Sequence, residues 1–166
     1  MITSQITLSR GIRLLAILTT FLVSEIAYSQ SCDASLVLEG NKNVGSADED
    51  GTQFVLIVKN ESNTTQNYQL NTNFLAESCA SANKANVGEN IPLDVHFKSQ
   101  LNSTLGSTRL TLSPNQSQRI NIDIQVPQGS SYNRWSCIQL ELASEQCSNL
   151  VATQLLRVFV PDPTEE

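Results

Sequence analysis

The sequence is poor in the residues and motifs on which catalysis and cofactor binding most often depend. Histidine and tryptophan each occur once, as His96 and Trp135. There is no Gly-x-Ser-x-Gly nucleophile motif, no phosphate-cradling glycine loop and no Cys-x-x-Cys pair. The common signatures of serine hydrolases, nucleotide-binding proteins and structural zinc sites are therefore missing. We predict no catalytic residue, no metal site and no cofactor.

Positive charge and long apolar runs are also scarce. The chain has 10 lysine and arginine residues against 16 aspartate and glutamate residues, a net charge of -6. Nucleic acids and anionic membranes bind basic surfaces, so we expect neither as a partner. The longest apolar run, residues 14–23, has about half the length that a membrane-spanning helix needs. Arg10 and Arg13 precede it and small residues follow at positions 27 and 29, which predicts a secretory signal peptide over residues 1–29.

All four cysteines follow the expected signal peptide: Cys32, Cys79, Cys137 and Cys147. An even number of cysteines after an export signal predicts two disulfides, formed in an oxidising compartment. We therefore expect a secreted or periplasmic protein. Attachment of a lipid to Cys32 is an alternative. It fits poorly, because Ser29 replaces the aliphatic residue of a bacterial lipobox and three cysteines would remain.

Apolar and polar residues alternate with a period of two through much of the chain after residue 30, which is typical of strands with one buried face. The pattern is clearest where Ile120, Ile122, Ile124 and Val126 alternate with polar residues. Turn residues separate the other expected strands, which are 35–39, 53–59, 68–74, 93–98, 110–112, 138–142 and 156–160. The pattern predicts an all-β fold, a single antiparallel β-sandwich of seven to eight strands. We expect it to occupy residues 30–161, with a flexible tail at 162–166.

Two parts of the sequence resemble bacterial immunoglobulin-like and fibronectin type III-like modules. The run Leu112-Ser-Pro-Asn-Gln-Ser117, the strand after it and Val126-Pro-Gln-Gly129 match the second half of such a module. Phe54–Asn60 followed by Tyr68-Gln-Leu70 matches its second and third strands. The resemblance extends over about residues 35–161 and implies an immunoglobulin-like sandwich. Similar modules stand beside secreted glycosidases and on cell surfaces, which implies adhesion or protein interaction at the cell envelope.

The resemblance also implies a disulfide pairing. In such a sandwich the third strand runs antiparallel to the sixth, which places two cysteines at each pole. This arrangement favours Cys79–Cys137 and Cys32–Cys147. The local alternative is Cys32–Cys79 with Cys137–Cys147.

The resemblance departs from antibody domains around Cys137. Trp135-Ser-Cys137 is similar to the aromatic-x-cysteine of the sixth strand, with tryptophan in place of tyrosine. Strand 53–59 has no cysteine to pair with it, so the intersheet disulfide of antibody domains is absent. The alternation also places Cys137 on the face opposite Ile138, away from the core, unless a bulge intervenes.

His96 is the one residue around which a hydrolytic or metal site could be built. Asp94 lies on the same face of strand 93–98, at a separation that suits a carboxylate orienting an imidazole. Both residues, however, also belong to the polar face of an alternating strand, and two ligands make a weak metal site. A hydrolase or metal site centred on His96 is therefore the minor alternative.

Polar loops carry two further motifs. The acidic run 48–51 lacks the ligand spacing of an EF-hand, so we expect a solvated turn rather than a calcium site. Asn-x-Ser/Thr sequons mark polar loops or, in a host that glycosylates, sugar attachment sites; they lie at Asn60, Asn63, Asn102 and Asn115.

Surface binding is the function that the sequence favours. Tyr132, Arg134 and Trp135 lie together at a loop–strand junction. Amphipathic aromatic residues beside an arginine are typical of protein-binding hot spots, and aromatic faces also stack on sugar rings. We expect these three residues to bind an envelope or extracellular protein or, in a stand-alone carbohydrate-binding module, a polysaccharide. The competing interpretation places Trp135 in a corner of the core.

Overall fold

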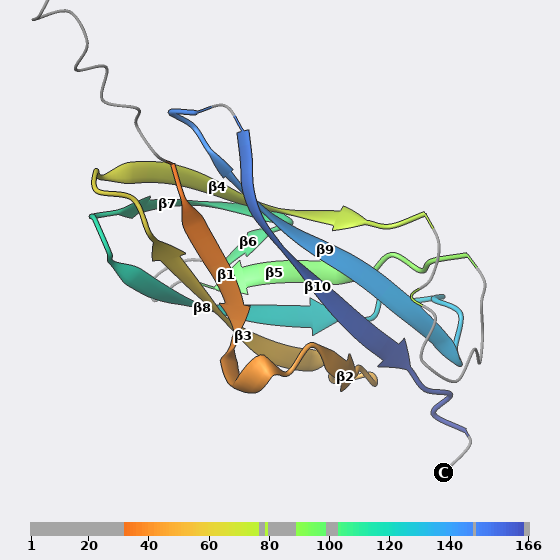
Figure 1. Cartoon of the computed structure of the whole chain (residues 1–166). Coiled ribbons are helices and arrows are strands. Elements are labelled where there is room, and N and C mark those ends of the chain that lie inside the picture. Colours follow the sequence, from red (N-terminus) through yellow and green to blue (C-terminus); the bar gives the residue numbers. More distant parts are fainter. Residues whose placement is uncertain (1–31, 77–78, 80–88, 99–102, 148, 165–166) are drawn as a thin grey trace, which may run out of the picture. The chain divides into compact units, whose positions relative to one another are not determined.

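The computed structural model describes residues 32–76, 79, 89–98, 103–147 and 149–164. The expected signal peptide, residues 1–29, and the sequon at Asn102 lie outside these ranges. The described part of the chain is all-β, as expected (Figure 1). Its strands are β1 (Ala34–Leu38), β2 (Val44–Ser46), β3 (Thr52–Asn60), β4 (Gln66–Phe74), β5 (Asp94–Lys98), β6 (Ser103–Leu105), β7 (Ser107–Leu112), β8 (Ser117–Gln125), β9 (Arg134–Ser144) and β10 (Asn149–Val160).

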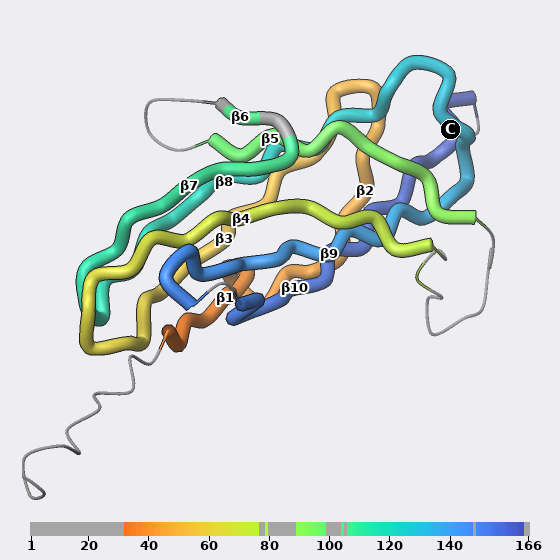
Figure 2. The backbone as a smooth tube through the Cα atoms, turned by 90° about the horizontal axis from the view of Figure 1, so that it is seen from above, coloured from red at the N-terminus to blue at the C-terminus, as the bar shows by residue number. Residues whose placement is uncertain are grey.

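The strands form two five-stranded sheets packed face to face, which confirms the β-sandwich (Figure 2). The first sheet has the order β1-β3-β8-β5-β6 and the second has the order β2-β10-β9-β4-β7. Immunoglobulin-like sandwiches place strands A, B, E and D in one sheet and C, F and G in the other, and both orders are found here. One difference is that β7, which lies beside β4, follows β5 in the chain rather than preceding it.

The eight strands expected from the sequence are present, and two three-residue strands, β2 and β6, are added in segments expected to be loops. Three residues are too few for an alternating pattern to be seen. The expectation of purely antiparallel pairing is corrected as well, because β2 pairs with β10 in parallel. At Gly45 in β2, a Cβ atom would lie 2.7 Å from Cζ of Phe54, so the missing side chain lets this strand approach the core.

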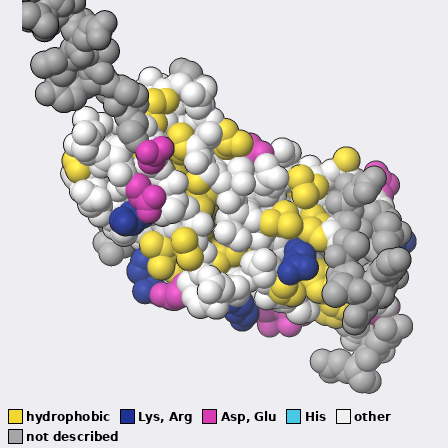
Figure 3. Space-filling view, in the orientation of Figure 1, with side chains coloured by type: hydrophobic (Ala, Val, Ile, Leu, Met, Phe, Trp, Pro, Cys, Tyr) yellow, Lys and Arg dark blue, Asp and Glu magenta, His cyan; other side chains and the backbone are white. Residues whose placement is uncertain are grey.

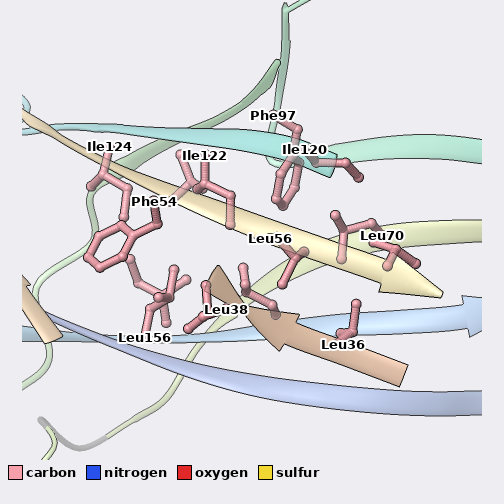
Figure 4. Close-up of a cluster of buried hydrophobic side chains, with 14 of the residues drawn as sticks. Leu36, Leu38, Phe54, Leu56, Leu70, Phe97, Ile120, Ile122, Ile124 and Leu156 are labelled. Carbon is pink, nitrogen blue, oxygen red and sulfur yellow. The ribbon is translucent and has the colours of Figure 1, made fainter. Parts of the chain in front are cut away.

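The hydrophobic core lies between the two sheets (Figure 4). Ile120, Ile122 and Ile124 of β8 are buried there, as the alternation predicts. The apolar run in β3 is not buried on both faces. Its even-numbered residues point into the core, whereas Val55 and Ile57 are half-buried on the outer face of the sheet.

A buried asparagine organises the polar end of the core. The Asn60 side chain has no exposed surface, and its Nδ2 donates to the carbonyl oxygens of Thr64 (2.8 Å) and Leu112 (3.0 Å). Its Oδ1 accepts from the hydroxyls of Ser62 (2.7 Å) and Tyr68 (2.9 Å). Asn60 is therefore a structural residue, and its sequon is inaccessible in the folded protein. The motif describes local sequence only, and burial is decided by strand packing.

We expect Tyr68 to make stability fall at high pH. Burial, and secondarily the charge of Asp33, raises the pKa of the phenol above its ordinary value of 10.0. The folded state therefore holds this proton where the unfolded chain has lost it, so stability is constant below about pH 10 and falls above it. The advantage of the wild type over Tyr68→Phe in urea denaturation should shrink between about pH 8 and about pH 11. A difference in stability between the wild type and Tyr68→Phe that stays the same over this pH range would contradict the role assigned to Tyr68.

Both expected disulfides are present, in the pairing that the resemblance favours. Cys32 pairs with Cys147 and Cys79 with Cys137, with Cα–Cα distances of 6.4 and 5.4 Å. Lipid attachment to Cys32 is thereby contradicted. Cys137 does lie on the face opposite Ile138, but it is fully buried, because Cys79 and Asn90 cover it: Asn90 Oδ1 accepts from the Cys137 backbone N–H at 2.8 Å.

Candidate functional site

The structure separates the three residues expected to form one binding site. Trp135 points to the outer face of the second sheet, because it shares the parity of Cys137 and not that of buried Ser136. Tyr132, in the loop before β9, lines a cleft at one pole of the sandwich. Arg134 lines a different hollow beside Asn90. Trp135 is not a core residue either, because its side chain is half-buried and lies outside the hydrophobic core.

Trp135 belongs to an apolar surface that adjacent strands build together. Its ring packs against Phe159, directly opposite on β10, with ring centroids 5.2 Å apart and planes inclined by 48°. Leu155 and Arg157 follow on the same face of β10, and Val44 of β2 lies opposite Arg157. We call these five residues, Val44, Trp135, Leu155, Arg157 and Phe159, the outer patch. Figure 3 shows hydrophobic side chains gathered around a basic one over this part of β10.

Arg157 gives the outer patch its charge. It is half-buried among apolar neighbours, and its Nε atom is buried without a hydrogen-bond partner among the residues that the structure describes. A guanidinium group in apolar surroundings favours an anionic partner, and carboxylates match its geometry. Such a combination of aromatic residues and arginine is characteristic of the centres of protein interfaces.

The part of the outer face around Glu141 is polar, and its side chains satisfy one another. Glu141 Oε1 accepts from Asn73 Nδ2 at 3.0 Å and from Gln139 Nε2 at 2.8 Å, and Gln69 Nε2 donates to Asn71 Oδ1 at 3.1 Å. Groups already paired gain little from a ligand, because each new hydrogen bond replaces an existing one. The outer patch is therefore the part of this face best suited to binding.

The β2–β3 loop, the β8–β9 loop and the end of β10 with the segment after it form the cleft that contains Tyr132, which we call the pole cleft. It has a volume of about 260 Å³, and its lining includes Asp48, Glu49, Val126, Tyr132, Val160 and Pro161. Tyr132 retains 46% of its surface.

The acidic turn beside the pole cleft is the solvated turn that the sequence predicts. The Asp48 carboxylate caps it by accepting from the backbone N–H of Asp50 at 3.0 Å, and Gly51 N donates to the Asp48 carbonyl at 3.0 Å. Gly51 has φ +81°, and a Cβ there would lie 2.3 Å from the Ile124 carbonyl oxygen. Only glycine fits that position. Asp48 and Glu49 are thereby held at the cleft with exposed side chains.

The backbone also fixes the other walls of the pole cleft. Ser130 donates to the Pro127 carbonyl oxygen through both its N–H (3.1 Å) and its hydroxyl (2.8 Å). Asn133 N donates to the Val160 carbonyl at 2.7 Å, and Asn133 Oδ1 accepts from Asp162 N at 3.3 Å. The first residues of the expected flexible tail are thus tied to the loop before β9.

His96 lies on the outer face of the other sheet, half-buried in β5. Asp94 is exposed on the same face, and Asp123 lies opposite His96 on β8, where it forms an ion pair with Lys98. Within the described ranges, no three histidine, cysteine, aspartate or glutamate residues are placed to hold a metal ion. The described part of the chain also contains no helix with the length and hydrophobicity to cross a bilayer.

Comparison with known proteins gives no family. No family model and no curated protein matches the sequence.

Solved structures match only distantly. One is a family 123 glycoside hydrolase from Clostridium perfringens, with 10% identity and TM-score 0.49. The match covers 80% of this chain but only 28% of the hydrolase. The PapD-like domain 7 of human CEP192 has 12% identity and TM-score 0.44, covering 87% of this chain and 94% of that domain. The apo form of the Calx CBD1 domain has 11% identity and TM-score 0.45, covering 78% and 99%. With identities and TM-scores this low, fold and function have to be argued from this chain's own residues.

Proposed function

We propose that this chain is an exported, non-catalytic module that binds a protein of the cell envelope or the extracellular space. The observation that carries the proposal is the outer patch, where Trp135, Phe159 and Leu155 surround the half-buried Arg157. The two disulfides support export, because such bonds form and persist in oxidising compartments. The acidic composition supports a protein partner over nucleic acid.

The outer patch has the composition of an interface centre rather than of ordinary sheet surface. Tryptophan and arginine are the residues whose truncation most often costs binding energy, and a polar rim that excludes water surrounds them in typical interfaces. Here the paired amides around Glu141 provide such a rim on one side. We propose that the partner presents a carboxylate to the part of the half-buried Arg157 guanidinium that remains accessible, since carboxylates match the geometry of this group.

We expect Trp135→Ala to weaken binding of the partner by at least about tenfold, because truncation removes the ring that packs on Phe159. The measurement is capture of solubilised envelope proteins from the host on the immobilised oxidised chain, residues 30–166, followed by titration of the captured protein. Thr153→Ala is the matched control, since Thr153 is exposed on β10 outside the outer patch. Equal affinity of the wild type and Trp135→Ala, with both folded, would exclude the outer patch as the binding surface.

A stand-alone carbohydrate-binding module is the second candidate, and exposed Tyr132 is the observation that favours it. Aromatic faces stack on sugar rings. The separation of Tyr132 from Trp135 leaves one aromatic ring in the pole cleft instead of a two-ring platform. Retention of the chain on an insoluble polysaccharide, lost on Tyr132→Ala but not on Trp135→Ala, would establish this function instead.

The hydrolase centred on His96 is the third and least supported candidate. Asp123, the carboxylate directly opposite His96, is engaged by Lys98. Asp94 is exposed at the surface. The arrangement is that of a polar strand face, so our proposal assigns His96 no catalytic role.

A further inference from the structure

We infer that the pole cleft is a second binding site, which receives the cationic side chain of a lysine or arginine from a polypeptide. The site is on a different surface from the outer patch, so the inference does not rest on the function proposed above. Three features of the pole cleft carry it: its charge, the chemistry of its walls and its size.

The charge around the pole cleft is negative. Asp48 and Glu49 line it with exposed carboxylates, and none of the described residues that line it is basic. Asp162 lies between two prolines that line the cleft, and it adds a third carboxylate there. Hydrogen bonds from the N–H and the hydroxyl of Thr164 lower the pKa of this carboxyl group. Carboxylates gathered around one cleft repel an anion and attract a cation at any pH where they are ionised.

The walls of the pole cleft match a group that only donates hydrogen bonds. Two of the lining residues, Pro161 and Pro163, have carbonyl oxygens but no N–H, and the carboxylates of Asp48 and Glu49 are acceptors. The carbonyl oxygen of Pro127 already accepts from Ser130. Lysine and arginine head groups have donors and no acceptors. A sugar hydroxyl both donates and accepts hydrogen bonds, so these walls match it less well.

The apolar part of the pole cleft suits an aliphatic stem beneath a charged head. Val126, Val160 and the prolines offer apolar surface to the methylene groups of lysine or arginine, which pack on such surfaces while the charge stays near water. The exposed ring of Tyr132 can face the cation itself.

The size of the pole cleft argues against an oligosaccharide as its ligand, and the number of available oxygen ligands argues against a calcium ion. At about 260 Å³ the pole cleft is at the lower limit for small-molecule pockets, which suits one side chain better than an oligosaccharide. A calcium ion needs at least six oxygen ligands, and one carboxylate oxygen of Asp48 already caps the turn.

The test is titration of the oxidised chain, residues 30–166, with blocked tripeptides, followed by NMR amide shifts. The probes are acetyl-Gly-Lys-Gly-amide and its arginine and norleucine counterparts. We expect the two cationic peptides to shift amides of residues 48–51, 126, 128–132, 160 and 162, with binding that weakens as salt is added. The norleucine peptide, which has a similar stem without charge, should bind at least about tenfold more weakly.

Variants separate this site from the outer patch. Glu49→Gln and Tyr132→Leu should each lower the affinity for the lysine peptide by about fivefold or more, whereas Trp135→Ala should leave that affinity unchanged. Asp48→Asn keeps an oxygen to cap the turn, so it tests the charge of Asp48 without breaking the loop. Equal binding of the norleucine peptide, shifts located elsewhere or the absence of any shift at millimolar peptide would each overturn the inference.

Discussion

Replacing Cys32 and Cys147 together by alanine is expected to lower the free energy of unfolding by about 4–5 kcal/mol. The disulfide joins residues 115 positions apart, so its removal restores to the unfolded chain the freedom of a loop that spans most of the fold. It also frees the start of β1 from the β9–β10 hairpin, at the pole where the described chain begins. A loss of this size is a large fraction of the stability of a domain of this length.

The measurement is urea denaturation of the double variant beside the wild type, without reductant. Wild type treated with a thiol and then alkylated is not a matched control, because it also loses Cys79–Cys137. The suitable comparison is the Cys79→Ala/Cys137→Ala variant, whose loop of 58 residues predicts a slightly smaller entropic loss of about 4 kcal/mol. A change below about 1 kcal/mol in the Cys32/Cys147 variant would contradict the role assigned to that disulfide.

Asn60→Ala is expected to cost about 3–4 kcal/mol, an unusually large effect for a polar residue. The substitution removes the donor to the Thr64, Leu112 and Ser113 carbonyls and the acceptor for the Ser62 and Tyr68 hydroxyls. Each buried group left without a partner costs about 1–3 kcal/mol, and neighbouring groups recover only part of that loss.

Asn63→Ala is the matched control for Asn60, because it is the same substitution three residues further along, at an exposed position in the β3–β4 loop. It should change stability by less than about 0.5 kcal/mol. Thermal and urea denaturation of both variants give the comparison. Similar small effects for the two would mean that water or a local rearrangement satisfies the polar groups around position 60.

The candidate site shows where reasoning from one strand reaches its limit. Alternation within β9 can tell that Trp135 and Cys137 share a face, and the structure agrees. It cannot tell that Phe159 lies opposite Trp135, because strand register is set by tertiary pairing. Tyr132 and Arg134, near neighbours in sequence, were expected beside Trp135. They point elsewhere, because successive strand residues alternate in direction and Tyr132 precedes the strand.

The sequence by itself determined the all-β class, the positions of eight strands and the inward direction of residues such as Ile122, since a period of two reports which face of a strand is buried. Through a resemblance, it also indicated both disulfides. Only the tertiary structure decided the parallel pairing of β2, the burial of Asn60, and the assembly of the outer patch and the pole cleft. The reason is that these features join segments far apart in the chain. Local patterns carry the preference of each segment for water or core, but not the identity of its neighbour.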